Sequence, residues 1–397
     1  MNSNSRRSTR TFDLPEMRRV HYGRGCSSRL PEAIAELGLK RPLLVTSPSV
    51  SNGPIGRSVR ESLGGLAIGV FTEVRSHAPA AAVLEAIEAA RAYRADGVIS
   101  LGGGSAIDTA KAVSMSMPEG VHDVDSLQAL SLTGGMINSP LAAEPLPHIS
   151  LPTTLGSSEF THSFTVTNSA TKMKDMYWDR RVVPQIAFLD ADLAIHTPDW
   201  LWASTGIKTV DHCIEWYLSL GRTPFTDALV LHALKELRDS LPLAVGQERD
   251  ADARQRCQIA AWMSAFGALN VVGGLSHAIG HHLGPRAGLV HGHTTSIVLP
   301  AVLEFNRPAT VERQAALAAA MGSDTTGLDT NSSACQLISA LNELIISMRL
   351  PRTLAEAGIW DADLSGVARA AMNDPMLRNN PRYVTLDDIE ALLGSIR

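Results

Sequence analysis

The chain has 397 residues, of which 45% are hydrophobic and 19% are charged, and its formal net charge is −5. The composition is typical of a soluble globular protein, and the length suggests two or three domains at roughly 100–200 residues each. The chain has no basic block of the kind that binds nucleic acid, and no apolar run reaches the ~20 residues that a membrane span requires. We therefore expect neither a nucleic acid nor a membrane as a partner.

The N-terminus and the cysteines predict a protein that stays in the cytoplasm. Residues 1–14 hold the cluster NSRRSTR, which no apolar run follows, so we expect a flexible tail and not a signal peptide. The four cysteines are scattered and form no CxxC pair. A large chain without paired cysteines favours a reducing compartment.

The chain then divides into two parts with different patterns. Apolar runs that predict buried strands lie at 41–47, 96–101, 146–154 and 184–190, and 80–95 has helical spacing. Long helical patterns follow at 199–221, 226–246, 251–272, 296–306, 310–322, 334–350 and 386–396. We therefore predict an α/β domain with a parallel sheet at 15–194 and an all-α domain at 195–397. The boundary is expected near Asp190–Pro198, with the ligand site between the two domains.

A glycine turn follows the strand at 96–101. Gly102, Gly103 and Gly104 let backbone N–H groups approach an anion, and the next helix directs its positive end to the same place. Ser105 can cap that helix, and its hydroxyl can reach a phosphate. The stretch is not a GxGxxG motif, so taken alone it predicts either phosphate binding or a tight turn.

A second polar loop, SLPTTLGSSEFT at 150–161, also follows a strand. It presents small hydroxyls around Gly156, namely those of Thr153, Thr154, Ser157, Ser158 and Thr161. Two such loops on one sheet predict a dinucleotide held across the strand ends. The alternative is a polar turn with local side-chain caps.

Five of the thirteen histidines lie in LSHAIGHHLGPRAGLVHGH, residues 275–293. If 275–283 is helical, His277 and His281 share one face, and GPRAG then breaks the helix. A turn can bring His291 back toward His277. The stretch therefore predicts a group of imidazoles drawn from two neighbouring segments.

The segment GIKTVDHCIEW contributes to the same group. Lys208 and His212 are four residues apart, on one face of the predicted helix. His212, His277 and His291 could thus converge, which favours a metal site or an active site over three structural histidines.

In combination, these motifs resemble the iron-containing (group III) alcohol dehydrogenases. The resemblance rests on GGGSAIDTAKA, LPTTLGSSEFT, VVPQIAFLDADL, STGIKTVDHCIEWY, SHAIGHHLG and HGHTTSIVLP, and it runs from HYGRG at 21–25 to the C-terminal helices. It implies a dehydroquinate synthase-like architecture, with an α/β dinucleotide-binding domain and a helical catalytic domain. It also implies a homodimer that interconverts small alcohols and carbonyls with NAD(H) or NADP(H).

The resemblance further implies a set of cofactor contacts. These are expected at Ser47, Gly102, Gly103, Gly104, Ser105, Asp108, Thr153, Thr154, Ser157, Thr161, Lys174 and Leu193. Thr46 and Ser47, at the end of the first predicted strand, carry no charge that would repel a 2′-phosphate. We therefore expect NADP(H) to be tolerated besides NAD(H).

The metal in such enzymes is held by one Asp and three His. By motif the histidines are His212, His277 and His291, but the Asp position is occupied by Lys208. A protonated ammonium has no lone pair and repels a cation. Asp211 faces about 100° away from His212 on a regular helix, so it could replace the missing ligand only if the helix is irregular. We predict no metal; if Fe or Zn is bound, those three histidines would hold it.

A metal-free branch of the family, the maleylacetate reductases, matches several features. Its members have a non-acidic residue at the Asp position and tend to carry HxP after the second strand, where this chain has His77 and Pro79. Asp108 is retained as in the metal-dependent members. We expect an NAD(P)H-dependent reductase of a carbonyl or enone such as the carboxylated maleylacetate. The alternatives are a metal-dependent alcohol dehydrogenase and a nucleotide-binding module without activity.

Without a metal, side chains must stabilise the alkoxide that hydride transfer forms. We expect Lys208 to do this with the three histidines, its pKa lowered by burial, and His281 to donate the proton. The alternative for Lys208 is a surface lysine on an amphipathic helix. Candidate partners for a substrate carboxylate are Arg75, His77, His162 and Arg286.

Overall fold

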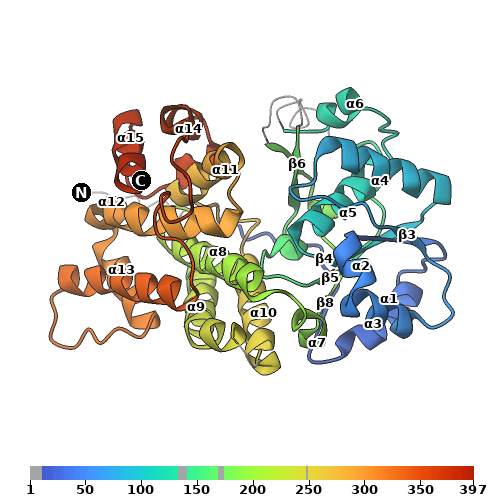
Figure 1. Ribbon diagram of the computed structural model, residues 1–397, viewed down its shortest axis with the longest axis horizontal. Helices are drawn as coiled ribbons and strands as arrows, with labels where there is room; N and C mark the ends of the chain where they lie inside the picture. Colours follow the sequence, from blue (N-terminus) through green and yellow to red (C-terminus); the bar gives the residue numbers. More distant parts are fainter. Residues whose placement is uncertain (1–10, 133–140, 169–173, 247–248) are drawn as a thin grey trace, which may run out of the picture.

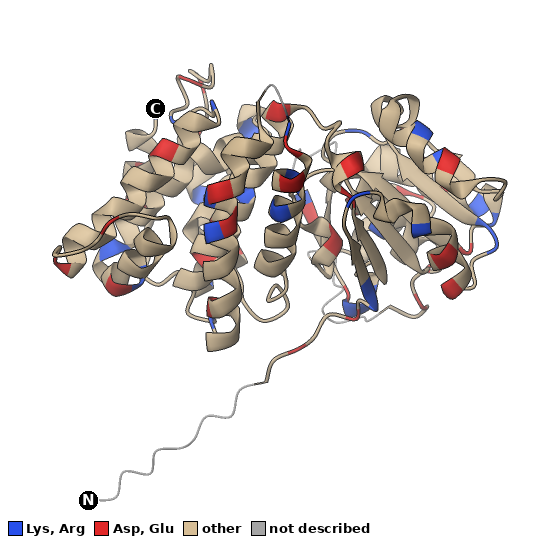
Figure 2. Cartoon of the chain, turned by 90° about the horizontal axis from the view of Figure 1, so that it is seen from below, with Lys and Arg blue, Asp and Glu red and all other residues tan. Residues whose placement is uncertain are grey.

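The computed structural model describes residues 11–132, 141–168, 174–246 and 249–397, which form two lobes (Figure 1). A parallel sheet and its covering helices make one lobe, and helices α8 to α15 make the other. The predicted order, an α/β part followed by a helical part, is confirmed. Acidic and basic residues are interspersed over the helices (Figure 2), in keeping with the small net charge.

The sheet has six parallel strands in the order β1-β8-β5-β4-β2-β3. They are β1 (Arg19–Tyr22), β2 (Pro42–Thr46), β3 (Gly69–Phe71), β4 (Gly97–Gly102), β5 (His148–Pro152) and β8 (Ile186–Leu189). The four central strands are buried throughout and are those that the apolar runs predict. The outer strands β1 and β3 are short and partly exposed, so no continuous apolar run marks them.

Helices cover both faces of the sheet. They are α1 (Leu30–Glu36), α2 (Pro48–Asn52), α3 (Pro54–Leu63), α4 (Ala80–Tyr93), α5 (Gly104–Ser116), α6 (Val124–Ala129) and α7 (Ala191–Ala194). Alternate residues of β2 enter different cores: Leu43 and Val45 pack with α4 and α5, and Leu44 packs with α1 and α3. An antiparallel hairpin, β6 (Ser163–Thr167) and β7 (Lys174–Trp178), follows β5.

The helical lobe begins directly after β8 and α7. It consists of α8 (Asp199–Leu218), α9 (Pro224–Ala244), α10 (Ala251–Ala265), α11 (Leu275–Ala287), α12 (His291–Ala320), α13 (Thr330–Ser347), α14 (Leu364–Ala371) and α15 (Leu386–Ser395). Helix α12 is kinked at Thr310, which joins the two patterns at 296–306 and 310–322. Within the described ranges, none of the helices combines the length and the apolar character needed to cross a bilayer.

The N-terminal tail is shorter than expected. The backbone N–H of Asp13 donates to Asn270 at 2.7 Å, and the ring of Phe12 packs edge-on against Phe225 with centroids 5.2 Å apart. Residues 11–14 are thus attached to the helical lobe, because an aromatic ring and a backbone group find partners there. The remainder of the predicted tail, 1–10, lies outside the described residues.

Helix α11, which carries His277, His281 and His282, is longer than expected. Helix α11 continues past residue 283 and through Pro285, and it ends at Gly288, whose φ of 66° suits a left-handed C-cap. A turn then leads into α12, which begins at His291. The break therefore comes from Gly288 rather than from Pro285, and it still returns His291 toward α11.

Candidate active site

Four imidazole rings meet where α8, α11 and the start of α12 come together. His212 on α8 stacks on His277 of α11 with ring centroids 5.2 Å apart. His277 lies 6.2 Å from both His281 and His291, and these two are 6.2 Å from each other. The structure thus brings together the four histidines that the sequence singles out.

Lys208 lies on α8 one turn before His212, it is half-buried, and its charge acts on the same imidazoles. Burial lowers the pKa of its ammonium, Lys174 lowers it further, and Asp108 opposes the shift. Burial likewise lowers the pKa of His212 and His291, and in both cases Lys208 is the next cause. These mutual effects show that the Lys208 charge acts on both imidazoles, which favours a role in the site over a solvated surface lysine.

The α/β lobe brings charged groups to the same region. Asp108 on α5 accepts a hydrogen bond from the Ser158 hydroxyl at 2.5 Å. Burial lowers the pKa of Lys174, and the negative charge of Asp108 opposes this shift. Glu159 is buried, which raises its pKa to about 7, and Lys208 is among the cations that oppose this shift. The site therefore lies at the junction of the two lobes.

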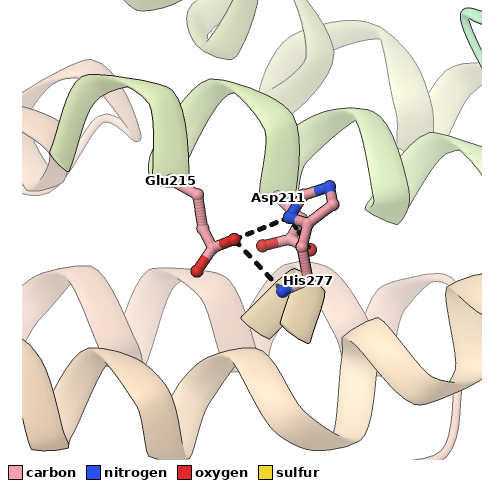
Figure 3. A group of neighbouring side chains, drawn as sticks. All are labelled: Asp211, Glu215 and His277. Atoms are coloured by element: carbon pink, nitrogen blue, oxygen red, sulfur yellow. Dashed lines mark hydrogen bonds and ion pairs between the residues drawn. The ribbon is translucent and has the colours of Figure 1, made fainter. Parts of the chain in front are cut away.

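Glu215 of α8 fixes the ring of His277 (Figure 3). Its Oε2 lies 2.6 Å from Nδ1 of His277, and the carboxylate also accepts the backbone N–H groups of Gly274, Ser276 and His277 at 2.9, 2.8 and 3.2 Å. Burial acts to raise the pKa of Glu215, but these bonds hold it below its usual value. Because a carboxylate only accepts, Nδ1 carries the proton and Nε2 is the free nitrogen of His277.

Asp211 also reaches this junction. It is buried, its Oδ2 lies 3.6 Å from Nδ1 of His277, and it accepts from the Ser276 hydroxyl at 3.2 Å. Its Oδ1 has no hydrogen-bond partner among the described residues, and burial raises its pKa. The expectation that Asp211 points away from the histidines is wrong, because His277 at the start of α11 lies within reach of both Asp211 and His212.

The donor groups at this junction do not fit a metal ion. Asp211, Glu215 and His277 place potential ligand atoms within 4.8 Å of one another. However, the Glu215 oxygens already accept four N–H groups, and Nδ1 of His277 is one of the donors. The three-histidine set faces the Lys208 ammonium where a carboxylate would be needed. Neither set combines free lone pairs with the negative charge that Zn²⁺ or Fe²⁺ requires.

The two polar loops lie side by side at the carboxyl edge of the sheet, since Gly102 of β4 is paired with Pro152 of β5. Gly102 has a φ of 143°, which favours glycine. A Cβ on Gly103 would lie 3.0 Å from Thr154, whereas a Cβ on Gly104 would meet no atom within 4 Å. The space before the N-terminus of α5 is therefore open, and backbone N–H groups there suit the pyrophosphate of NAD(P).

Other expected cofactor contacts flank this space. Ser47 caps α2 by accepting from the N–H of Val50 at 3.4 Å, and the Thr46 hydroxyl donates to a backbone carbonyl of β4. Thr153 and Thr154 are buried within the second loop. The side chains at the end of β2 thus carry no negative charge, as expected.

Ser105 does not cap α5, because the residue at the N-cap is Gly103 and no side-chain cap is present. Its hydroxyl instead accepts the backbone N–H of His77 at 3.0 Å. His77 has a φ of 63°, and both burial and Lys174 lower the pKa of its ring. Ser105 therefore holds the His77 segment beside the glycine turn.

Three further candidates have internal roles in the structure. The Ser157 hydroxyl is buried against two backbone carbonyls, and Thr161 accepts a hydrogen bond from the buried ammonium of Lys111 at 3.0 Å. Leu193 is 2% exposed and packs in the core below the sheet. Their side chains are therefore not available to a cofactor, because packing and hydrogen bonds within the chain already occupy them.

Most candidate partners for a substrate carboxylate lie away from the histidines. The ring of His162 packs edge-on against Trp178 of the β6–β7 hairpin. Arg75 pairs with Glu85 on the surface at 3.1 Å, and Arg286 donates to the carbonyl of the preceding turn of α11. His77 shares an electrostatic neighbour, Lys174, with the site.

The sequence reasoning missed three carboxyl groups that matter here, Glu159, Glu215 and Asp374, and it set Asp211 aside. Glu215 follows Asp211 by one helical turn, a spacing that could have revealed both as partners of α11. Glu159 stands inside the second polar loop, where only its hydroxyl neighbours drew attention. Asp374 contacts His281 from 93 residues farther along the chain, and nothing local marks it.

A dinucleotide cradle opposite a group of histidines is typical of nicotinamide-dependent oxidoreductases with a helical catalytic lobe. The iron-containing alcohol dehydrogenase family model matches residues 17–191, and the model for the C-terminal part of the same family matches 202–396. The chain belongs to the iron-containing alcohol dehydrogenase family, and it is an NAD(P)-dependent oxidoreductase.

Characterised relatives cover the chain almost fully. It is 30% identical to the NAD-dependent methanol dehydrogenase of Bacillus methanolicus and to the lactaldehyde reductase of Escherichia coli (strain K12), over 94% of this chain and 96% of either relative. A crystal structure of 1,3-propanediol oxidoreductase matches with a TM-score of 0.89 at 27% identity, covering 98% and 100% of the two chains. The maleylacetate reductase of Agrobacterium tumefaciens matches with a TM-score of 0.78 at 25% identity, covering 98% of each.

Proposed function

We propose that the protein reduces the carbonyl group of a small carboxylated substrate with NADH or NADPH, without a metal. The observation that carries this proposal is the position of Lys208. Its positive charge acts on His212, His277 and His291, and it stands at the position where the resemblance places an acidic metal ligand. A cation built into the chain can stabilise the oxyanion that a metal would otherwise stabilise.

The bound nicotinamide would supply the hydride, and the chain's own groups would handle the negative charge and the proton. Lys208 is a strong hydrogen-bond donor, and its lowered pKa eases proton release toward an alkoxide. Nε2 of His277 is held free by Glu215 and can take part in orienting the substrate oxygen. His281, one turn farther along α11, is the proposed proton donor.

The charges around the site support an acidic substrate. Lys174 and Lys208 each bring an ammonium to the junction, and the positive charge of Lys174 lowers the pKa of Lys208 and of His77. Either ammonium could pair with a substrate carboxylate. The fold neighbours include a protein named maleylacetate reductase, which is consistent with such a substrate.

One observation favours a second candidate, a metal-dependent alcohol dehydrogenase. Asp211 is buried beside His277, and its Oδ1 has no hydrogen-bond partner among the described residues. Such an oxygen could bind a metal ion. We rank this candidate second because the ammonium of Lys208 would repel the cation.

Metal content and a substrate panel separate the two candidates. The purified protein would be assayed with maleylacetate, lactaldehyde and 1,3-propanediol, with NAD(H) and NADP(H), before and after EDTA. The proposal predicts maleylacetate reduction that resists EDTA and gains nothing from Zn²⁺ or Fe²⁺. Activity that EDTA abolishes and one of these ions restores would establish the second candidate instead.

Assembly, compartment and domain limits remain predictions. A cytoplasmic homodimer is tested by light scattering and by the oxidation state of the free cysteines. The boundary near Asp190–Pro198 is supported by the family models, which end at 191 and begin at 202. Limited proteolysis with cleavage between residues 191 and 202 would support this domain boundary further.

A further inference from the structure

A second carboxylate–imidazole pair lies at the edge of the histidine group. Nδ1 of His281 is 2.9 Å from Oδ2 of Asp374, whose side chain is 7% exposed. Asp374 belongs to the C-terminal segment between α14 and the short helix η5 (Pro375–Asn379). The pair therefore links the segment between α14 and η5 to the site on α11.

The carboxylate of Asp374 is itself anchored. Its Oδ1 accepts the backbone N–H of Met376 at 2.9 Å, which caps η5, so Oδ2 is left to face His281. Nε2 of His282 lies 3.3 Å from the same Oδ2. Burial opposes ionisation, but the contacts with the two histidines and the backbone bond hold the pKa of Asp374 well below its usual range. The group is an anion with a fixed direction.

We propose that Asp374 is a positioning residue that holds His281 in the tautomer protonated at Nδ1. Nε2 is then the atom that exchanges a proton with the reacting oxygen. The inference rests on the proposed function insofar as His281 is the proton donor there. Asp374 does for His281 what Glu215 does for His277, but from a segment that neither α8 nor α11 supplies.

The chemistry follows from what each group can donate. A carboxylate only accepts, so Nδ1 of His281 must carry a proton, and the ring presents Nε2 on its opposite side. In the reductive direction the imidazolium, protonated on both nitrogens and stabilised by Asp374, gives its Nε2 proton to the alkoxide oxygen, and the ring returns to the neutral Nδ1–H form. In the oxidative direction Nε2 takes the alcohol proton, and Asp374 stabilises the imidazolium that forms.

Asp374→Asn reverses this arrangement with minimal change of shape. The amide oxygen can keep the cap on the N–H of Met376, so the amide NH₂ then faces Nδ1 of His281. Two donors cannot pair, and Nδ1 must become an acceptor. His281 is thereby forced into the Nε2–H tautomer. This form cannot accept a proton at Nε2, and it can give up its Nε2 proton only by becoming an imidazolate, so both directions of the reaction should be slowed.

The first readout is spectroscopic and needs no substrate. Nitrogen-15 spectra of histidine-labelled protein report the tautomer of each ring, and the variant His281→Asn identifies the signals of His281. We expect the Nδ1–H form in the parent and the Nε2–H form in Asp374→Asn. An Nε2–H form in the parent, or an unchanged tautomer in the variant, overturns the inference.

The second readout is turnover. Asp374→Asn should lower kcat for maleylacetate, or for lactaldehyde if that is the substrate reduced, by about 10²–10⁴-fold, the range of general acid–base catalysis, with NADPH affinity unchanged. Asp363→Asn is the matched control, since Asp363 caps α14 by accepting from Gly366 at 2.8 Å and belongs to the same C-terminal region. It should leave both readouts unchanged. Equal loss of kcat in the two variants would assign Asp374 a purely structural role and contradict the inference.

The outcome is separable from that of the proposed function. If the parent proves to need a metal, the proposed function fails, but the tautomer of His281 still tests Asp374. If the parent is active without a metal and Asp374→Asn keeps its tautomer and its turnover, the inference about Asp374 alone is wrong.

Discussion

On α8, Lys208 lies one turn before His212, and its ammonium is second only to burial in lowering the pKa of that imidazole. A neutral imidazole is the form that accepts a hydrogen bond or binds a cation. Here the nearby cation is already part of the chain, so the site carries its own positive charge. On the proposed function, this relationship would separate the protein from family members in which a divalent ion supplies that charge.

Replacing Lys208 by Met should remove the charge and keep most of the buried volume. We expect turnover to fall on the order of 10²–10³-fold, the usual cost of losing one oxyanion-stabilising donor, while NADPH still binds. Steady-state kinetics and nicotinamide fluorescence titration would check the two halves of this prediction. Turnover equal to that of the parent would show that Lys208 does not face the substrate oxygen.

Replacing Gly104 by Val tests the cofactor cradle. A Cβ at this position meets no atom within 4 Å, so the variant should fold, but its side chain would occupy the space proposed for the pyrophosphate. We expect NADPH affinity to fall at least about tenfold, which corresponds to about 1.4 kcal/mol. The matched control is Gly394→Val on α15, where a Cβ also meets open space and affinity should not change. Equal affinities in the two variants would mean that the phosphates bind elsewhere.

Glu215→Gln tests how the site is anchored. The carboxylate accepts four N–H groups at the start of α11, and an amide NH₂ in its place would oppose at least one of them. We expect the free energy of unfolding to fall by about 3 kcal/mol, as for a broken buried pair. Urea denaturation measures it, with the exposed Glu304→Gln as the control that should change stability by about 0.5 kcal/mol or less.

Glu159 should make stability depend on pH. Burial raises its pKa from 4.5 to about 7, so the folded state binds this proton more tightly than the unfolded chain does. The corresponding stabilisation is fully present below pH 4.5 and is lost as the pH rises to about 7. Over this interval the parent should lose on the order of 3 kcal/mol relative to Glu159→Gln. The free energy of unfolding of both proteins would be measured at pH 5 and at pH 8. The same difference between parent and variant at both pH values would contradict this account.

The sequence predicted the sheet and the histidine group because both have local signals. Continuous apolar runs mark the central strands, and the spacing of His277 and His281 marks one helical face. The partners of these side chains were not predictable in the same way. Asp211 was set aside on the geometry of its own helix, although the neighbouring α11 decides which faces of α8 are used.

Hydroxyl groups in the polar loops illustrate the same limit. Their pattern suggested a row of donors for a dinucleotide, but Thr161 pairs with the buried Lys111, and Ser157 turns into the core. Whether a hydroxyl faces a ligand or the chain depends on which buried groups need a partner. Asp374 shows the converse, since its role depends on a contact with His281 across 93 residues.

The most direct test of the metal-free site is the variant Lys208→Asp. It places a carboxylate one helical turn before His212 and so recreates an acidic ligand beside His212, His277 and His291. Isothermal titration with Zn²⁺ and Fe²⁺, under the same conditions for parent and variant, measures the consequence. We predict that the variant binds one equivalent of metal that the parent does not bind. Equal metal affinity in the two proteins would contradict the account, because it would mean that residue 208 does not face the three histidines.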